Sequence, residues 1–219
     1  MKRFIETIKN IFKIEELRTR IVYTILLLLV YRLGSYVVLP GIDPTQLANL
    51  KSQASTGLLG LLDMFSGGAF GNASIFALGV MPYISASIVI QLLGVMVPYF
   101  QRMQREGESG RRKMNQWTRY LTIVILLLQG PAYITNMMYQ LGASSTAIYP
   151  FDGSEPTTFF WISSILILTS GTLFVMWLGE RITEKGVGNG ISMILLVNIV
   201  ASLPNDFSNL IKKFVINPT

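Results

Sequence analysis

The chain contains neither cysteine nor histidine. The lack of cysteine excludes a disulfide framework and a thiolate metal site within it. The lack of histidine removes the most common metal ligand and the most common general base. Charged residues are also scarce, at 14% of the 219 residues, whereas soluble domains usually carry about 25%. These absences disfavour a metalloenzyme and direct attention to the hydrophobic residues, which make up 51% of the chain.

Long apolar runs account for the missing charge and predict an all-α polytopic membrane protein. A transmembrane helix needs about 20 apolar residues. Such runs predict five transmembrane helices, at residues 21–39, 73–98, 121–141, 159–178 and 187–203. The positive-inside rule places the N-terminus in the cytoplasm, because most lysines and arginines fall in residues 1–20, 99–120 and 179–186.

The segments at the two ends of the chain have a different character. Residues 1–18 predict an amphipathic helix that lies in the cytoplasmic membrane interface. Residues 205–219 follow Pro204 and predict an external surface segment. Transport proteins often pair two halves of inverted topology. A five-helix unit with a discontinuous helix suits one such half, with the second half expected beyond residue 219.

The discontinuity lies between the first two predicted spans. An apolar segment at residues 58–65 stops at Ser66, Gly67 and Gly68, and an apolar helix is expected to restart at Ala73 with Pro82 as an internal kink. Non-helical backbone at membrane depth is tolerated only where protein buries it or a water-filled cavity hydrates it. The broken helix therefore indicates a pathway through the protein. The glycines either allow the short segment to move or pack against a neighbouring helix.

Two pairs of branched apolar residues sit one helical turn apart. Val80 and Ile84 share a face of the second span, and Ile191 and Leu195 share a face of the fifth. Such pairs on two helices form an apolar constriction that excludes ions by dewetting. The alternative is ordinary packing against other helices or lipid.

A few polar residues interrupt the spans. Ser85, Gln91 and Gln129 are uncharged and are expected to form hydrogen bonds between helices. Arg32 is the one charge well inside a predicted span, and it either serves a function there or extends its head group to the interface. The second to fifth spans carry no ionisable acid, base or histidine, which disfavours an intramembrane protease or an ion-coupled carrier.

The segment at residues 99–120 is basic and is predicted to be a cytoplasmic loop. It either docks an acidic partner or RNA phosphates, or sets the topology by its charge. Gly186, Gly188 and Gly190 match no nucleotide-binding pattern and predict a tight start to the last helix. Energy for any transport is therefore expected from outside the chain.

Several long motifs, in this order, resemble the SecY family, the central subunits of bacterial protein-conducting channels. The resemblance extends from Arg18 to Pro204. Its motifs are Met64-Phe65-Ser66-Gly67-Gly68-Ala69, Met81-Pro82-Tyr83-Ile84-Ser85-Ala86-Ser87, Glu106-Gly107-Glu108-Ser109-Gly110-Arg111-Arg112-Lys113, Met176-Trp177-Leu178-Gly179-Glu180 and Gly188-Asn189-Gly190-Ile191-Ser192.

The resemblance implies a fold of two five-helix halves, of which this chain is the first, and it assigns roles to residues. The pore ring consists of Val80, Ile84, Ile191 and Leu195. The plug, a short half-helix at residues 58–72, includes Leu62, Met64, Phe65, Ser66, Gly67 and Gly68. The lateral gate lies between the helices at 73–98 and 121–141 and is lined by Ser85, Gln91 and Gln129. Contacts with cytoplasmic partners are assigned to Arg105, Arg111, Arg112 and Lys113.

The same resemblance implies a function. It is that of the pore-forming subunit of a protein translocase, which passes unfolded preproteins across and into the inner membrane, without enzymatic activity or a cofactor. The implied partners are SecE-like and SecG-like small membrane subunits, a SecA-type motor ATPase, the ribosome, signal sequences and preproteins, membrane lipids and the C-terminal half of the same protein. Two other functions remain open from the residues alone, a secondary transporter of small solutes and a membrane scaffold without a pore.

Overall fold

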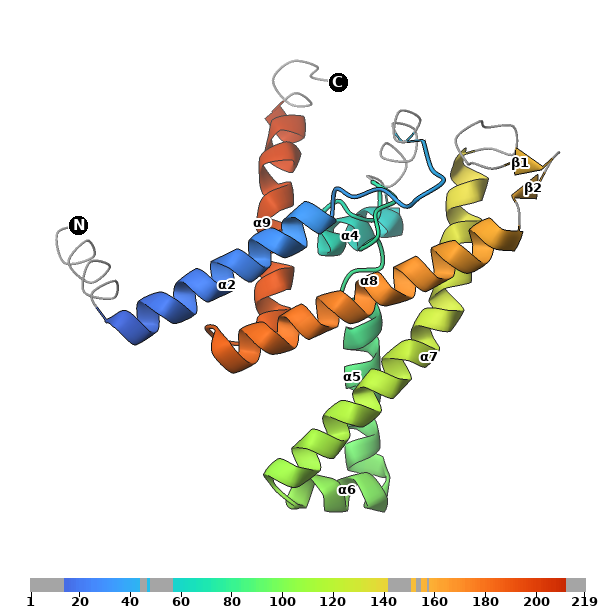
Figure 1. The fold of residues 1–219 in the computed structure, drawn as a ribbon. Helices are drawn as coiled ribbons and strands as arrows, with labels where there is room; N and C mark the ends of the chain where they lie inside the picture. Colours follow the sequence, from blue (N-terminus) through green and yellow to red (C-terminus); the bar gives the residue numbers. More distant parts are fainter. Residues whose placement is uncertain are drawn as a thin grey trace.

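The structure, a computed structural model, describes residues 14–43, 47, 57–141, 151–152, 155–156 and 158–211. Within these ranges the regular elements are helices, joined by turns, and the two-residue strands β1 (Phe151–Asp152) and β2 (Glu155–Pro156), which pair antiparallel. The helices, labelled in Figure 1, are α2 (Glu15–Gly34), α4 (Gly57–Ser66), α5 (Met81–Met96), α6 (Pro98–Arg105), α7 (Glu108–Leu141), α8 (Thr158–Lys185) and α9 (Gly190–Ile211).

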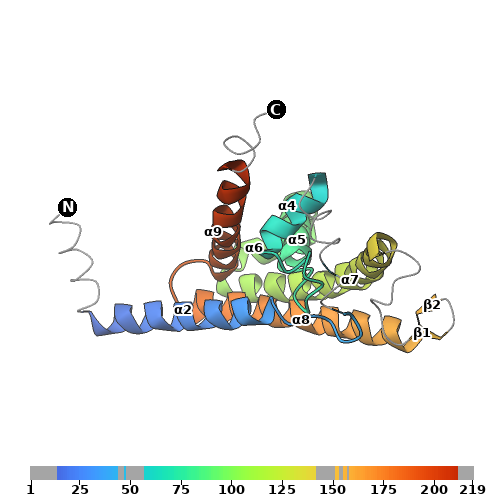
Figure 2. The ribbon, with the colours of Figure 1, turned by 90° about the horizontal axis from the view of Figure 1, so that it is seen from above.

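Helix α8 is the centre of the packing. Helix α2 runs side by side with it, and α7 and α9 also contact it (Figures 1 and 2). Helix α5 packs against α7, and the short α4 contacts α9. Seen from above, α9 projects away from the layer that α2 and α8 form (Figure 2). The first, fourth and fifth predicted spans thus enclose the segment that links α4 to α5.

The helices confirm a polytopic membrane protein. Helices α7 and α8 are each long and apolar enough to cross a membrane. Helices α5 and α6 together pass the same test as one span bent by 98°. The apolar part of α9, Gly190–Leu203, is shorter than a span. By length and composition the described residues therefore hold two or three spans, and the count of five remains a prediction.

The restart of the broken helix was predicted too early. Residues 67–80 form a series of turns, and α5 begins at Met81 with Val80 as its N-cap residue. Pro82 lies in the first turn of α5, where its missing N–H breaks no helical hydrogen bond, so it starts the helix rather than kinks it. The apolar composition of residues 73–80 misled the prediction, because a buried turn and a buried helix have similar composition.

The basic segment at residues 99–120 was predicted as a loop, whereas the structure makes it largely helical. Val97 adopts an extended conformation before Pro98, as residues that precede proline tend to do, and this ends α5. Residues 99–120 instead form α6, a turn at 106–107 and the start of α7. Gly110 lies so close to the Met103 carbonyl that a side chain there would overlap it. The segment is therefore a tight helical hairpin.

The ends of the outer helices differ from the predicted boundaries. Residues 15–18 belong to α2 rather than to a separate amphipathic helix, whose residues 1–13 lie outside the described ranges. Helix α9 continues through Pro204 to Ile211. Residues 205–211 of the expected external segment therefore belong to this helix. Residues 212–219 lie outside the described ranges. Helix α8 extends to Lys185, which shortens the turn before α9.

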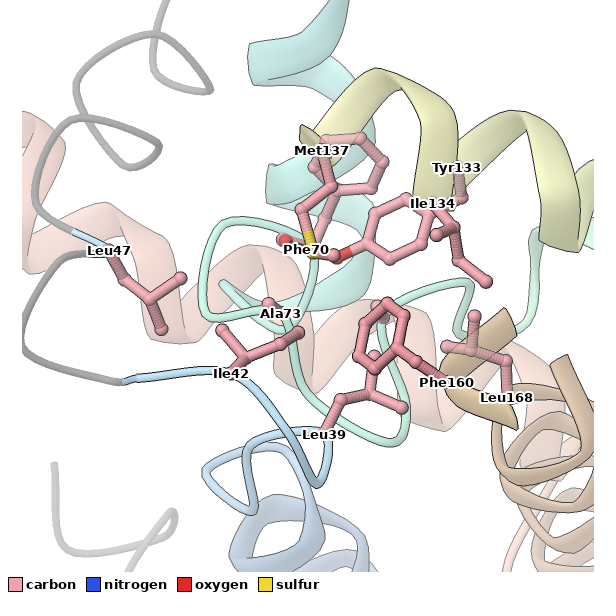
Figure 3. Close-up of a cluster of buried hydrophobic side chains, with 11 residues drawn as sticks. Leu39, Ile42, Leu47, Phe70, Ala73, Tyr133, Ile134, Met137, Phe160 and Leu168 are labelled. Atoms are coloured by element: carbon pink, nitrogen blue, oxygen red, sulfur yellow. Dashed lines mark hydrogen bonds between the residues drawn. The ribbon is translucent and has the colours of Figure 1, made fainter. Parts of the chain in front are cut away.

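Two clusters of buried side chains hold these elements together. The first, drawn in Figure 3, joins Leu39, Ile42 and Leu47 to α7, α8 and residues 67–80, here called the turn segment. In this cluster the Tyr133 hydroxyl donates to the Phe70 carbonyl at 2.9 Å. The second joins α2, the turn segment, α8 and α9 through Leu27, Tyr31, Phe76, Val80, Val175, Leu178, Ile182 and Ile194. The non-helical backbone at residues 67–80 is thus enclosed by protein, as a membrane interior requires.

A close approach between α8 and the turn segment generates a test of this packing. A Cβ atom on Gly171 would overlap the carbonyl oxygen of Ile75, whereas one on Gly130 would meet Ile165 at 3.8 Å. We expect Gly171→Ala to lower the free energy of unfolding by about 1–3 kcal/mol through overpacking. Gly130→Ala is the matched control, expected to be neutral or stabilising because alanine favours a helix. Thermal unfolding in detergent measures both, and equal midpoints would contradict the packing described.

Candidate functional site

The four residues predicted to form a ring lie together. Val80 closes the turn segment, and its carbonyl accepts a hydrogen bond from the Ile84 N–H at 3.0 Å, so the two residues are one turn apart. Val80 is buried in the second cluster, and Ile84, Ile191 and Leu195 are half-buried against that cluster. The fold therefore brings two residues at the start of α5 next to two on α9.

The start of α9 is fixed by hydrogen bonds. The Asn189 side-chain oxygen accepts from the backbone N–H groups of Ile191 at 3.1 Å and Ser192 at 3.3 Å, as a helix N-cap does. The N–H of Gly190 donates to the Thr183 hydroxyl at 2.8 Å. These bonds confirm the tight helix start predicted from the glycines, and they fix the height of Ile191 and Leu195 relative to α8.

An open hollow of about 740 Å³ lies beside these residues. Ile84, Ile191 and Leu195 contribute apolar side chains to its lining. The rest of the lining is largely polar or charged and includes Gln91, Glu108, Arg111, Arg112, Asn115, Arg119 and Glu180. The hollow thus connects three of the predicted ring residues with two of the basic residues predicted to contact cytoplasmic partners.

Ion pairs shape the charged side of this hollow. The Arg119 guanidinium donates from Nε to Oε1 of Glu180 at 2.9 Å and so joins α7 to α8. On the α6–α7 hairpin, Arg112 pairs with Glu108 at 3.0 Å and Lys113 with Glu106 at 3.2 Å. Arg105 and Arg111 are exposed and form no ion pair with described residues. The hairpin therefore presents a net positive surface.

The predicted plug consists of helix α4 and the first turns after it. The helix ends at Ser66, and Gly67 and Gly68 follow in the left-handed region, with φ of 67° and 85°. The Ser66 hydroxyl accepts from the Phe70 N–H at 3.0 Å, and the Asp63 carboxylate accepts from the Gly71 N–H at 2.7 Å. These local bonds shape the sharp reversal after the helix. Leu62, Met64 and Phe65 are half-buried.

Side chains from two other helices bond the last carbonyls of the plug. Asn198 of α9 donates from Nδ2 to the Phe65 carbonyl at 2.8 Å and to the Tyr31 hydroxyl at 2.9 Å. The Tyr31 hydroxyl donates to the Ser66 carbonyl at 3.2 Å, and Arg32 Nη1 donates to the Gly67 carbonyl at 2.5 Å. Arg32, the one charge inside a predicted span, thus donates to the predicted plug. Sequence reasoning overlooked Tyr31 and Asn198, although a lone asparagine in an apolar helix was a usable signal.

The three residues predicted to line the lateral gate separate into two places. Ser85 and Gln129 line a second hollow of about 300 Å³ together with Leu62 of the plug. Gln91 lines the first hollow and donates to Ser87 of its own helix at 3.2 Å. The interhelical hydrogen bond expected of Gln91 is therefore not formed among the described residues. Ser85 and Gln129 do face a common space between α5 and α7.

Comparison with known proteins agrees with the sequence motifs. The family model described as SecY matches residues 74–218. Three proteins named protein translocase subunit SecY are similar to this chain. That of Escherichia coli K12 is 45% identical over 198 residues, which cover 90% of this chain and 43% of the relative. That of Buchnera aphidicola from Schizaphis graminum is 44% identical over 198 residues, covering 90% and 44%.

The third relative, from Buchnera aphidicola of Baizongia pistaciae, is 41% identical over 215 residues, which cover 97% of this chain and 47% of the relative. The chain thus spans less than half the length of these relatives. The family model covers well over half of the chain itself, from the turn segment through α9. The likeness includes the helices that carry the ring and the basic hairpin. The chain belongs to the SecY family.

Proposed function

We propose that this chain forms one half of the pore of a protein translocase, which passes unfolded preproteins across and into the inner membrane. The observation that carries the proposal is that Ile84, Ile191 and Leu195 line one open hollow, with Val80 buried in the cluster against which they pack. A passage for chains of any sequence cannot depend on specific polar recognition. A collar of aliphatic side chains gives a deformable contact and resists ions by dewetting.

In this proposal α2, α5, α7, α8 and α9 are the five spans, with the N-terminus in the cytoplasm. The C-terminal half of the same protein supplies the remaining ring residues and closes the pore. Helix α4 is the plug on the outer side of the ring. Its contacts with α9 and its bonds to Tyr31, Arg32 and Asn198 support that position.

Helices α5 and α7 form this half of the lateral gate. Ser85, Gln129 and Leu62 line one hollow between them, which supports a seam that includes the plug. Large apolar side chains of both helices are exposed, among them Leu92 of α5 and Leu127 and Leu128 of α7. A signal sequence is itself apolar, and such a surface is suited to pass it to lipid.

The cytoplasmic hairpin of α6 and α7 is the proposed docking surface for the partners that supply energy or substrate, a SecA-type motor and the ribosome. Its support is the exposed positive charge of Arg105, Arg111, Arg112 and Lys113. SecE-like and SecG-like membrane subunits and lipids complete the assembly. The motor supplies the energy, since the chain carries no nucleotide-binding motif.

The ring assignment is tested by crosslinking. A photoreactive residue placed at Ile84 or Leu195 is expected to crosslink to a preprotein stalled in transit, because both side chains line the hollow. The matched control is Leu166, an exposed apolar residue of α8, expected to crosslink at about a tenth of that yield or less, because crosslinking needs contact at van der Waals distance. Gel mobility of radiolabelled preprotein provides the measurement.

The same experiment separates the alternatives. Equal crosslinking at Leu166 and Leu195 would contradict a central passage and favour a scaffold without a pore. A solute carrier would give no preprotein adducts at either ring position. A separate uptake assay would then show saturable transport of a small molecule.

The docking surface is tested by charge removal. We expect Arg105→Ser with Arg111→Ser to weaken binding of the motor several-fold, because exposed charge contacts contribute about 0.2–1 kcal/mol each. The loss should shrink as salt is raised, since salt screens exposed charges. Arg18→Ser, which removes another exposed arginine on α2, is the control. Sedimentation of the motor with membranes measures binding, and an equal loss in the control would contradict a specific surface.

A further inference from the structure

Three side chains, Tyr31, Arg32 and Asn198, here called the plug anchor, bond three consecutive carbonyls at the end of α4. Tyr31 and Asn198 are fully buried. Helix C-termini leave their last carbonyls unpaired within the helix, and those groups need donors from elsewhere when they are buried. The plug anchor supplies such donors from α2 and α9. It therefore fixes where the plug rests.

Asn198 shares one face of α9 with two ring residues. Ile191, Leu195 and Asn198 follow the i, i+4, i+7 spacing that aligns side chains along a helix. Ile191 and Leu195 border the open hollow, and Asn198 lies beyond them along the same helix, at α4. Because an α-helix is stiff over so few turns, a displacement at Leu195 is transmitted to Asn198.

Asn198 fits its site closely but not completely. A Cβ atom at Gly67 would overlap the Asn198 side-chain oxygen, so the turn after α4 lies directly on this residue. That oxygen is buried and has no hydrogen-bond partner among the described residues. An unpaired buried acceptor destabilises the arrangement in which Asn198 holds the end of α4. If α9 moved and water reached this oxygen, the new hydrogen bond to water would offset part of the free energy lost with the Asn198 bonds to Phe65 and Tyr31.

We propose that α9 couples the ring to the plug, with Asn198 as the positioning residue. A polypeptide that pushes Ile191 and Leu195 aside carries Asn198 away from the Phe65 carbonyl and the Tyr31 hydroxyl, and this releases the end of α4. The inference rests on the proposed function, because it takes a polypeptide as the object that enters the ring. Each bond changes the ratio of held to released plug roughly fivefold, a size that holds the plug at rest and allows release.

The absence of cysteine from the chain allows a direct test with one thiol reporter. Ser66→Cys is nearly isosteric and places a thiol at a buried position at the end of α4. Its alkylation by a maleimide, measured in native membranes that contain the complete translocase, reports release of the plug. In this background Asn198→Leu removes the donor from α9, and Tyr31→Phe removes the hydroxyl while its ring remains stacked on Phe76.

We expect Asn198→Leu to speed alkylation roughly fivefold or more, and Tyr31→Phe to act in the same direction, since each removes hydrogen bonds to the plug. The matched control is Ser202→Ala on the same helix, because the Ser202 hydroxyl bonds the Ile199 carbonyl of α9 itself. Its rate should stay within about twofold of the parent, as expected for a change that leaves the plug bonds in place. Unchanged rates in both Asn198→Leu and Tyr31→Phe would overturn the proposal.

A stalled preprotein tests the coupling itself. It is expected to raise the alkylation rate of the parent to that of Asn198→Leu, and to add nothing further in Asn198→Leu, because both act on the same bonds. A full additional increase in that variant would show that release bypasses α9. Failure of the proposed function is distinguishable, since it would remove preprotein crosslinks at Ile84 and Leu195 while Asn198→Leu still exposed the thiol.

Discussion

The structure depends on satisfying the backbone of residues 67–80 in an apolar surrounding. A helix satisfies its own carbonyls and N–H groups, whereas a run of turns at membrane depth cannot do so unaided. Here Arg32 and Tyr133 donate to carbonyls of this segment, and a β-bridge between Val38 and Ser74 supplies backbone partners. Tyr31 and Asn198 donate to the carbonyls of Ser66 and Phe65, directly before it. The helices that provide these groups, α2, α7 and α9, therefore lie around the turn segment, and α8 approaches it closely through Gly171.

The same constraint links the fold to its proposed use. If the second predicted span were helical from residue 73, its first turns would occupy space that the turn segment now leaves for α4. Because the helix starts late, at Met81, one end of α5 opens toward the hollow that Ile84 and Leu195 line. In the proposed pore, the exposed apolar surfaces of α5 and α7 are the faces available to lipid and to a C-terminal half. The charged lining of the first hollow includes residues of the hairpin and the Arg119–Glu180 pair.

The sequence predicted much of this arrangement, for identifiable reasons. Helical spacing placed Ile191 and Leu195 on one face, and the break at Ser66 and Gly67 was visible as a loss of apolar residues. The extent of the break was not visible, because Ala73 and Gly79 are as apolar as helix residues yet adopt positive φ values. The plug anchor was missed for a related reason. Tyr31 and Asn198 are 167 residues apart, and only tertiary packing brings them into hydrogen-bond contact.

The N-cap position of Val80 has a consequence for the collar as a whole. Three of its members on this chain stand on helices, whereas Val80 is attached to the last turn of the non-helical segment. The position of its side chain therefore depends on the backbone conformation of that segment rather than on a rigid helix. In the proposed pore, the ring and the plug are consequently coupled through one segment of the chain. If the proposal holds, any change in the conformation of residues 67–80 would move Val80, so the width of the closed pore would depend partly on the segment that follows the plug.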